Sequence, residues 1–222
     1  TMSITGPDRF KAVSRLIVVP CWMLGNWVTT FGAVEFVEQL RMNHHGVSVP
    51  QKVIVLGGGN TAMDAASESA RMGAGKVILA YRRTQEEMPA YDFEYDLAKS
   101  VGVKGMFSVA PLEILGNGKV EAVKFICTKS ENGKITSIPG SEFIETCDWV
   151  IKATGQSKQT ELLKLITGLQ LNSNGTISVN ENFRTSHPKY FAAGDAVSGG
   201  EEVVNAVANG KQAAKAIFEL LQ

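Results

Sequence analysis

Residues 52–83 read KVIVLGGGNTAMDAASESARMGAGKVILAYRR, and this stretch predicts a strand, a glycine-rich turn, a helix and a second strand. Residues 53–56 form a short apolar run with β-branched members, which is typical of a strand buried on both faces of a parallel sheet. A second apolar run, residues 77–81, follows the helix. The sequence therefore predicts an α/β protein with a Rossmann-like domain.

The turn of this unit has the pattern G-x-G-x-x-A, which is typical of dinucleotide-binding proteins when it lies between a strand and a helix. Gly57 permits a tight turn, Gly59 lets a pyrophosphate approach the backbone, and Ala62 lets the helix pack close to the sheet. The free N–H groups and the dipole of the helix favour a bound phosphate. The alternative is a glycine turn that serves packing alone. The predicted binding residues are Gly57, Gly58, Gly59, Asn60, Thr61 and Ala62.

The end of the second strand indicates which dinucleotide to expect. An NAD-selective site usually has an acidic residue there, which binds the ribose 2′-hydroxyl. Arg82 and Arg83 stand in this region instead, and guanidinium groups suit a 2′-phosphate. We therefore expect NADPH rather than NADH, with a solvated charge pair as the alternative for the two arginines. The following segment, residues 88–90, is a further candidate for a wall of the cofactor pocket.

A β-meander is expected after this unit. Pro89 suits the first turn of a helix that continues over residues 91–101, and residues 103–110 predict a third strand. Asn117-Gly118 and Asn132-Gly133 are strong hairpin signals. The α/β pattern returns at residues 148–153. The strands expected between these points are residues 112–115, 120–128, 134–138 and 142–146.

The last third of the chain predicts a second, partial α/β domain. A short helix at residues 161–166 precedes strands at 175–179 and 190–195. The second strand ends in Gly194-Asp195, just before a helix over residues 203–221. This arrangement suits a second phosphate or ligand platform, although Asp195 alternatively caps a turn. The expected packing face of the final helix is Ala206, Gly210, Ala213, Ala214 and Ile217.

The first 49 residues give fewer indications of structure and function than the rest of the chain. Residues 16–19 predict a strand and residues 33–42 an amphipathic helix, followed by a polar linker. The apolar run at 16–24 superficially resembles a signal peptide, but Pro20 interrupts it and no A-x-A site follows. The three cysteines are scattered without a C-x-x-C pair, which favours a reducing compartment. We therefore expect a cytoplasmic protein without a metal site.

The formal net charge of zero excludes a general electrostatic attraction to nucleic acid or to an anionic membrane. We therefore expect neither as a partner. A hydrophobic content of 44% and a charged content of 20% are ordinary for a globular protein.

Six segments together resemble one family, the glutamate synthase small (beta) subunit-like group of NADPH-dependent FAD oxidoreductases. This group belongs to the pyridine nucleotide-disulfide oxidoreductase superfamily, lacks a redox disulfide, and includes the reductase part of dihydropyrimidine dehydrogenase. The similarity covers about residues 50–222, in family order. The segments are GGGNTAMDAA, YRRTQEEMPA, APLEILGNGKV, DWVIKATGQ, FRTSHPKYFAAGD and VVNAVANGKQAA.

The resemblance implies a poorly matched segment at 1–49, an NADPH-binding domain at 50–155 and the C-terminal part of an FAD-binding domain at 156–222. It implies that the glycine turn and the arginine pair hold NADPH, and that Gly155 lies where the NADPH domain returns to the FAD domain. It also implies that hydride passes from NADPH to FAD without a catalytic protein acid or base. The residues expected to contact FAD are Gly194, Asp195, Val203 and Val204.

One family feature is absent from this sequence. The family has a first G-x-G-x-x-G for the ADP half of FAD, and residues 1–50 contain only isolated glycines. The sequence therefore does not predict that this chain binds FAD alone. We expect a subunit that supplies the missing FAD half or the electron acceptor, or self-association. The alternatives are a nucleotide-binding module without catalysis of its own, and a dehydrogenase acting directly on a small substrate, for which no Tyr–Lys or His spacing is found.

Overall fold

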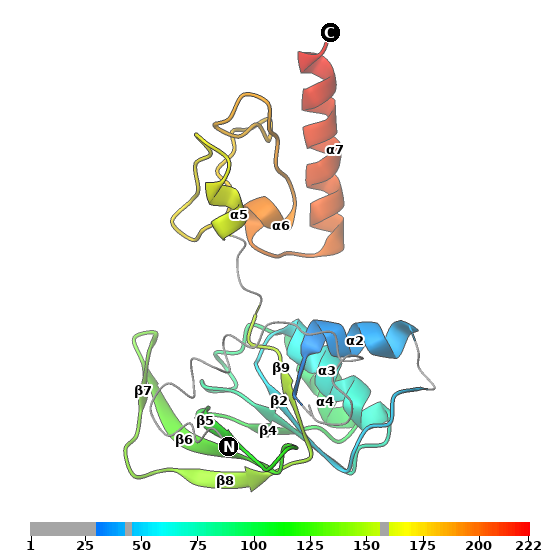
Figure 1. Cartoon of the computed structure of the whole chain (residues 1–222), viewed down its shortest axis with the longest axis vertical. Coiled ribbons are helices and arrows are strands. Elements are labelled where there is room, and N and C mark those ends of the chain that lie inside the picture. Colours follow the sequence, from blue (N-terminus) through cyan, green and yellow to red (C-terminus); the bar gives the residue numbers. More distant parts are fainter. Residues whose placement is uncertain (1–29, 43–45, 156–159) are drawn as a thin grey trace. The chain divides into compact units, whose positions relative to one another are not determined.

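The computed structural model describes residues 30–42, 46–155 and 160–222 (Figure 1). The chain forms two compact units that divide between Gly155 and Gln156. This division falls where the sequence predicts the start of the partial second domain. The strand expected at residues 16–19 lies outside the described residues.

The first unit is built on a five-stranded parallel sheet with strand order β1-β9-β2-β3-β4. Strand β2 is central and pairs in register with β3, from Lys52 opposite Lys76 to Leu56 opposite Ala80. The predicted Rossmann-like parallel sheet is therefore confirmed. The strands are β1 (Thr30–Gly32), β2 (Lys52–Leu56), β3 (Lys76–Ala80), β4 (Lys104–Met106) and β9 (Trp149–Lys152).

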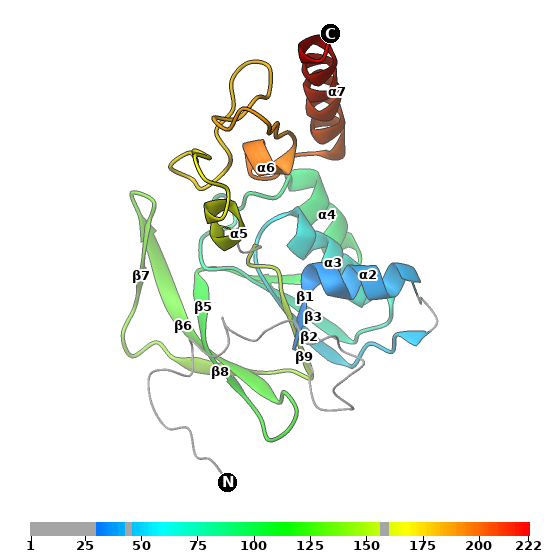
Figure 2. The ribbon, with the colours of Figure 1, turned by 45° about the horizontal axis from the view of Figure 1, so that its top comes forward.

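Alternate side chains of each central strand enter two different cores. Val53 and Val55 of β2 pack with the helices, whereas Ile54 and Leu56 pack with the β-meander. All four are buried, which explains the continuous apolar run. Figure 2 shows α2, α3 and α4 together on one side of the sheet. The helices are α2 (Ala33–Met42), α3 (Asn60–Arg71) and α4 (Asp92–Ser100).

The predicted β-meander is confirmed, with β6 at its centre pairing antiparallel with β5, β7 and β8. Asn132 and Gly133 both adopt positive φ, as a two-residue hairpin requires. The single strand expected at 103–110 is wrong, because Ser108 has φ of 54° and separates β4 from β5. The strands are β5 (Val109–Leu115), β6 (Ala122–Glu131), β7 (Lys134–Ser137) and β8 (Phe143–Thr146).

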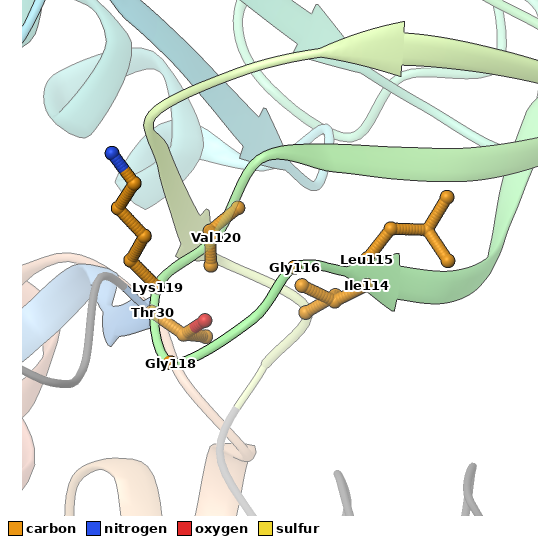
Figure 3. Close-up of a pocket in the computed structure, with 7 residues that line it drawn as sticks. All are labelled: Thr30, Ile114, Leu115, Gly116, Gly118, Lys119 and Val120. Carbon is orange, nitrogen blue, oxygen red and sulfur yellow. The ribbon is translucent and has the colours of Figure 1, made fainter.

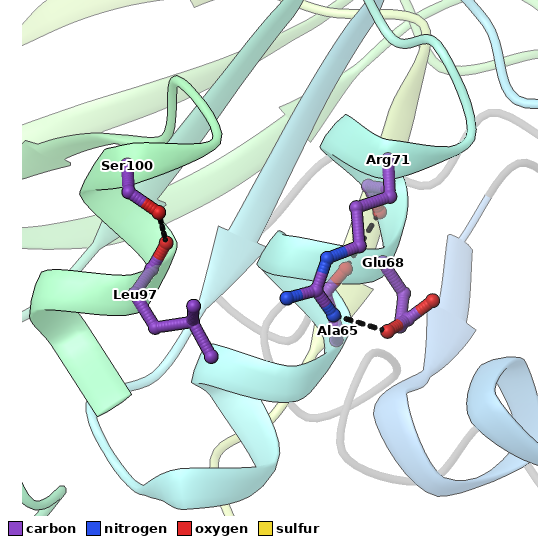
Figure 4. A network of polar contacts seen from close by, with 6 residues as sticks. Ala65, Glu68, Arg71, Leu97 and Ser100 are labelled. Carbon is purple, nitrogen blue, oxygen red and sulfur yellow. Dashed lines mark hydrogen bonds and ion pairs between the residues drawn. The ribbon is translucent and has the colours of Figure 1, made fainter. Parts of the chain in front are cut away.

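Polar side chains of α3 and α4 form hydrogen bonds and an ion pair with residues of the same helix (Figure 4). Ser69, which is fully buried, donates from Oγ to the carbonyl of Ala65 at 2.7 Å. The guanidinium of Arg71 pairs with Glu68 one turn earlier at 2.8 Å. Because of its bond to Ala65, the buried hydroxyl of Ser69 has a hydrogen-bond partner.

Helix α4 does not begin at Pro89 as the sequence predicts. Its N-cap is Tyr91, which has an extended backbone with φ of −65° and ψ of 141°. The N–H of Ala90 donates to the carbonyl of Gly58, so the preceding residues follow the glycine turn rather than the helix axis. Tertiary contact thus overrides the preference of proline for a helix start.

The second unit contains α5 (Thr160–Lys164), α6 (Asp195–Ser198) and α7 (Val203–Leu220). The strands predicted at 175–179 and 190–195 do not form; isolated bridges such as Leu171 with Ile177 take their place. Within the described part of this unit, no neighbouring strand forms continuous backbone hydrogen bonds with these two segments. An extended segment without such a partner is not a β-strand.

The predicted packing face of α7 is largely wrong. Ala213 is buried, whereas Gly210 and Ala214 are exposed and Ile217 is 36% exposed. Among the described residues, no helix is both long and apolar enough to cross a membrane.

Candidate functional site

The first two glycines of the turn are required by packing. Gly57 has φ of 149°, donates its N–H to the carbonyl of Ala80 at 3.0 Å, and lies so close to Ala153 that a Cβ would meet the Ala153 carbonyl oxygen. A Cβ on Gly58 would approach the ring of Tyr81 to 2.6 Å. The turn is therefore closed against β3 and β9 by the absence of side chains.

Gly59 differs from its two neighbours because a Cβ there would meet nothing within 4 Å. Gly59 is the N-cap of α3 and offers no side chain to its N–H groups, and the first turn holds no acidic residue. No described residue accepts a hydrogen bond from the N–H groups of Asn60 or Thr61. The turn therefore presents free donors, the positive end of a helix dipole and open space, which together suit a phosphate.

The loop after β3, residues 81–91, is attached to this turn. Ala90 donates its N–H to the carbonyl of Gly58, and Tyr91 donates its N–H to Oδ1 of Asn60, both at 3.1 Å. The hydroxyl of Tyr81 donates to the carbonyl of Glu87 at 3.1 Å and closes the loop on itself. Residues 88–90, a sequence-based candidate for a pocket wall, therefore lie beside the glycine turn.

The same loop is attached to the meander on its other side. Thr128 donates its hydroxyl to the carbonyl of Arg82 at 2.9 Å, and Ser130 donates to Oε1 of Glu87 at 2.6 Å. Arg83 donates from Nη2 to the carbonyl of Gly133 at 3.2 Å. The meander thus supports the segment that carries both arginines.

Two guanidinium groups in this loop have unused donors. The side chain of Arg82 is exposed and makes no hydrogen bond or ion pair with the described residues. Nε of Arg83 is buried, and no described group accepts its hydrogen. An unpaired buried donor costs about 1–3 kcal/mol, whereas the Arg83 side chain as a whole is only part-buried and can still meet a ligand. The residues present therefore fit the phosphate groups of a dinucleotide.

Sequence reasoning missed Tyr81, Glu87, Thr128 and Ser130 as parts of this site. Ser130 and Glu87 are 43 residues apart in the chain. No local pattern links a serine in a meander strand with a glutamate in a loop. The only available signal was the run of polar side chains between Arg83 and Pro89.

The remaining predicted site residues occupy other places. Gly155, with φ of 93°, ends the first unit. Gly194 is buried, with φ of 62°, and a Cβ there would lie 3.3 Å from Cβ of Ala206 on α7. Asp195 begins α6, and Val203 and Val204 at the start of α7 are 79% and 67% exposed. The structure thus brings Gly194 close to α7 within the second unit.

A pocket of about 230 Å³ lies elsewhere in the first unit, at the turn between β5 and β6 (Figure 3). Figure 3 shows Lys119 and Thr30 on one side of it and Ile114 on the other. It contains none of the predicted binding residues. Its lining is Thr30, Ile114, Leu115, Gly116, Gly118, Lys119 and Val120.

Comparison with known sequences gives one matching family, the pyridine nucleotide-disulphide oxidoreductases, over residues 26–210. The glutamate synthase [NADPH] small chain of Escherichia coli (strain K12) is 40% identical over 184 residues, which are 78% of this chain and 39% of that protein. The NAD-dependent dihydropyrimidine dehydrogenase subunit PreT of Escherichia coli (strain K12) is 32% identical over 222 residues, or 97% of this chain and 50% of that subunit.

The NADP(+)-dependent formate dehydrogenase subunit beta of Moorella thermoacetica is 36% identical over 197 residues, covering 85% of this chain and 28% of that subunit. The chain therefore spans between 28% and 50% of these relatives.

Solved structures share the fold. The thioredoxin reductase of T. acidophilum superimposes with a TM-score of 0.67 at 24% identity, covering 88% of this chain and 58% of that one. Mycobacterium tuberculosis FprA, solved in complex with NADPH, superimposes with a TM-score of 0.63 at 16% identity, covering 93% and 60%.

Proposed function

Because this chain belongs to the pyridine nucleotide-disulphide oxidoreductase family, we propose that it is the NADPH-binding portion of a flavin-dependent oxidoreductase. When bound, NADPH and FAD supply the hydride chemistry, and the protein supplies binding and orientation. The chain's own residues hold the nucleotide and fix its position. No protein acid or base takes part in the hydride step.

The observation that carries this proposal is the open glycine turn beside an arginine pair. Gly59 leaves room for a pyrophosphate, and the N–H groups of Asn60 and Thr61 are free to bind it. Gly57, Gly58 and Ala62 serve the site by letting the turn, β3 and α3 pack closely. The loop at 81–91 then carries Arg82 and Arg83 beside this turn.

The arginines favour NADPH over NADH. Relatives of this chain carry both specificities in their names, since the glutamate synthase small chains are named for NADPH and the PreT subunit for NAD. In this chain the exposed guanidinium of Arg82 and the part-buried side chain of Arg83 suit a doubly charged 2′-phosphate.

We assign Gly155, Gly194, Asp195, Val203 and Val204 to the FAD side of the complete protein. This rests on the family, on the exposure of Val203 and Val204, and on the buried backbone at Gly194. Because the chain spans at most half of the curated relatives cited above, the rest of the FAD site comes from further sequence or from another subunit. That subunit, or another, also provides the electron acceptor.

The experiment that tests this proposal is a calorimetric titration. The purified chain is titrated with NADPH and, separately, with NADH, and the heat gives the dissociation constant of each nucleotide. We expect NADPH to bind more tightly. Arg82→Gln and Arg83→Gln should each weaken NADPH binding by about tenfold, the effect of one charge-assisted hydrogen bond, and leave NADH nearly unchanged. Equal loss for both nucleotides in these variants would contradict the assignment to the 2′-phosphate.

Flavin binding is tested separately. FAD is added to the chain and then removed by gel filtration, and the visible absorbance of the protein is recorded. A retained flavin that bleaches with NADPH under anaerobic conditions supports a reductase site within this chain or its oligomer. Tight NADPH binding without retained flavin supports the alternative, a nucleotide-binding module that depends on a partner for catalysis.

A further inference from the structure

The arginine assigned to the 2′-phosphate is attached to the tip of a hairpin in the meander. Nη2 of Arg83 donates to the carbonyl of Gly133 at 3.2 Å. Asn132 and Gly133 have φ of 50° and 76°, so this carbonyl belongs to a tight turn between β6 and β7 with a defined direction. One end of the guanidinium is therefore fixed by an element that follows about fifty residues later in the chain.

The loop that follows Arg83 is closed by the carboxylate of Glu87. Oε2 accepts from the N–H and the hydroxyl of Thr84 at 3.2 and 3.3 Å, and Oε1 accepts from Ser130 of β6 at 2.6 Å. These hydrogen bonds, with that of Ser130 the largest, lower the pKa of Glu87, and the positive charge of Arg83 adds to the effect. Both oxygens are therefore engaged and the group is charged at neutral pH.

These contacts restrict the guanidinium of Arg83 at two of its nitrogens. Nε is buried and unpaired among the described residues, while Nη2 is held by Gly133. Because Nη2 is bonded and Nε is buried, the guanidinium is oriented before a ligand arrives, while the Arg83 side chain as a whole is only part-buried. Such preorganisation strengthens and sharpens the recognition of a phosphate.

We propose that Glu87, Ser130 and the Asn132-Gly133 turn are positioning residues that hold Arg83 ready for the 2′-phosphate of the dinucleotide. The preference for NADP(H) over NAD(H) then depends on the meander as well as on the arginine pair. This inference rests on the proposed function. These groups act through Arg83 and its loop, so their removal affects recognition of the 2′-phosphate more than recognition of the rest of the nucleotide.

The test uses the full 222-residue chain and two probes that differ by the 2′-phosphate, 2′,5′-ADP and 5′-AMP. Calorimetry gives the ratio of their dissociation constants. Glu87→Gln and Ser130→Ala should each weaken 2′,5′-ADP binding by about threefold to tenfold and leave 5′-AMP unchanged, because they loosen one member of a coupled network. Ser130→Thr keeps the hydroxyl and should restore the ratio.

Matched controls are available for both changes. Glu86→Gln removes the adjacent exposed carboxylate, whose pKa is lowered by its own backbone and by Thr84 rather than by Ser130. Ser137→Ala removes an exposed hydroxyl from the other end of β7. Neither control should change the ratio. If Glu87→Gln does not fold, the Ser130→Ala and Ser130→Thr pair carries the test.

The outcomes separate the inference from the proposed function. An unaltered chain that binds neither probe overturns both. An unaltered chain that prefers 2′,5′-ADP, with the same preference in Glu87→Gln and Ser130→Ala, leaves the proposed function intact and overturns the inference. Equal weakening of both probes in these variants also overturns it, because it indicates a general structural role.

Discussion

At the scale of single residues, the three adjacent glycines have different reasons to be glycine. Gly57 is constrained by Ala153, which follows β9, and Gly58 by the Tyr81 ring, whereas Gly59 faces open space. The sequence predicts a tight turn at Gly57, which forms, and close ligand approach at Gly59, which stays a prediction. Gly58, which the sequence places among the predicted binding residues, packs against the Tyr81 ring.

Alanine at these positions should separate stability from binding. Gly57→Ala is expected to destabilise the chain by about 2 kcal/mol or more, because it combines a positive φ with a backbone clash. Gly59→Ala should change the unfolding free energy by less than about 1 kcal/mol, yet weaken NADPH binding because its methyl group enters the space for the pyrophosphate. Urea denaturation and nucleotide titration measure the two effects. A stable Gly57→Ala chain would contradict this account of the turn.

The structure describes two of the three cysteines. Cys127 and Cys147 are both free. Burial, the largest cause, raises the pKa of Cys147 to about 12, with Asp148 and Glu145 adding to the effect. The thiol is therefore neutral at physiological pH and packs as a small apolar side chain in the core between the sheet and the meander.

At the scale of elements, the helix predicted at 33–42 forms with the same bounds and packs on the parallel sheet. Its Phe36 is 1% exposed and meets Trp149 of β9 edge-on, with ring centroids 6.2 Å apart. Val34 of the same helix is 46% exposed. The helix belongs to the dinucleotide-binding unit through these contacts with β9 and through its packing against α3.

Two substitutions in this helix should differ in their effects on stability. Phe36→Ala is expected to lower the unfolding free energy of the first unit by about 3–5 kcal/mol, because it opens a cavity beside Trp149. Val34→Ala, the exposed control, should change it by no more than about 0.5 kcal/mol. Denaturant titration followed by tryptophan fluorescence measures both. Similar values for the two variants would argue against docking of α2 on the sheet.

At the scale of the whole molecule, the two units differ in how much apolar surface they bury. The first has two cores on opposite faces of its sheet. In the described part of the second, Ala213 is the one buried apolar side chain, and Val203, Val204, Phe218 and Leu221 are all at least 62% exposed. A helix with such a face is normally covered by another element. This agrees with the family relatives being longer than this chain.

Hydrogen exchange should report this difference directly. Amides of β2, β3 and β9 are expected to exchange slowly, because they lie in the centre of a sheet buried on both faces. Amides of residues 160–222 should exchange far faster in the isolated chain. Added NADPH should slow exchange at residues 57–62 and 82–91. Equal protection in the two units would mean that the second unit is covered in solution.

The sequence by itself determined the unit at 52–83, the hairpins of the meander and the family, because local periodicity and turn chemistry encode these features. The matched family confirms the resemblance carried by the motifs. Only the tertiary structure joined Glu87, Ser130 and Gly133 around Arg83, since hydrogen bonds between distant segments leave no local pattern. The tertiary structure also decided that residues 175–179 and 190–195 form no strands, because a strand exists only when a neighbouring segment pairs with it through backbone hydrogen bonds.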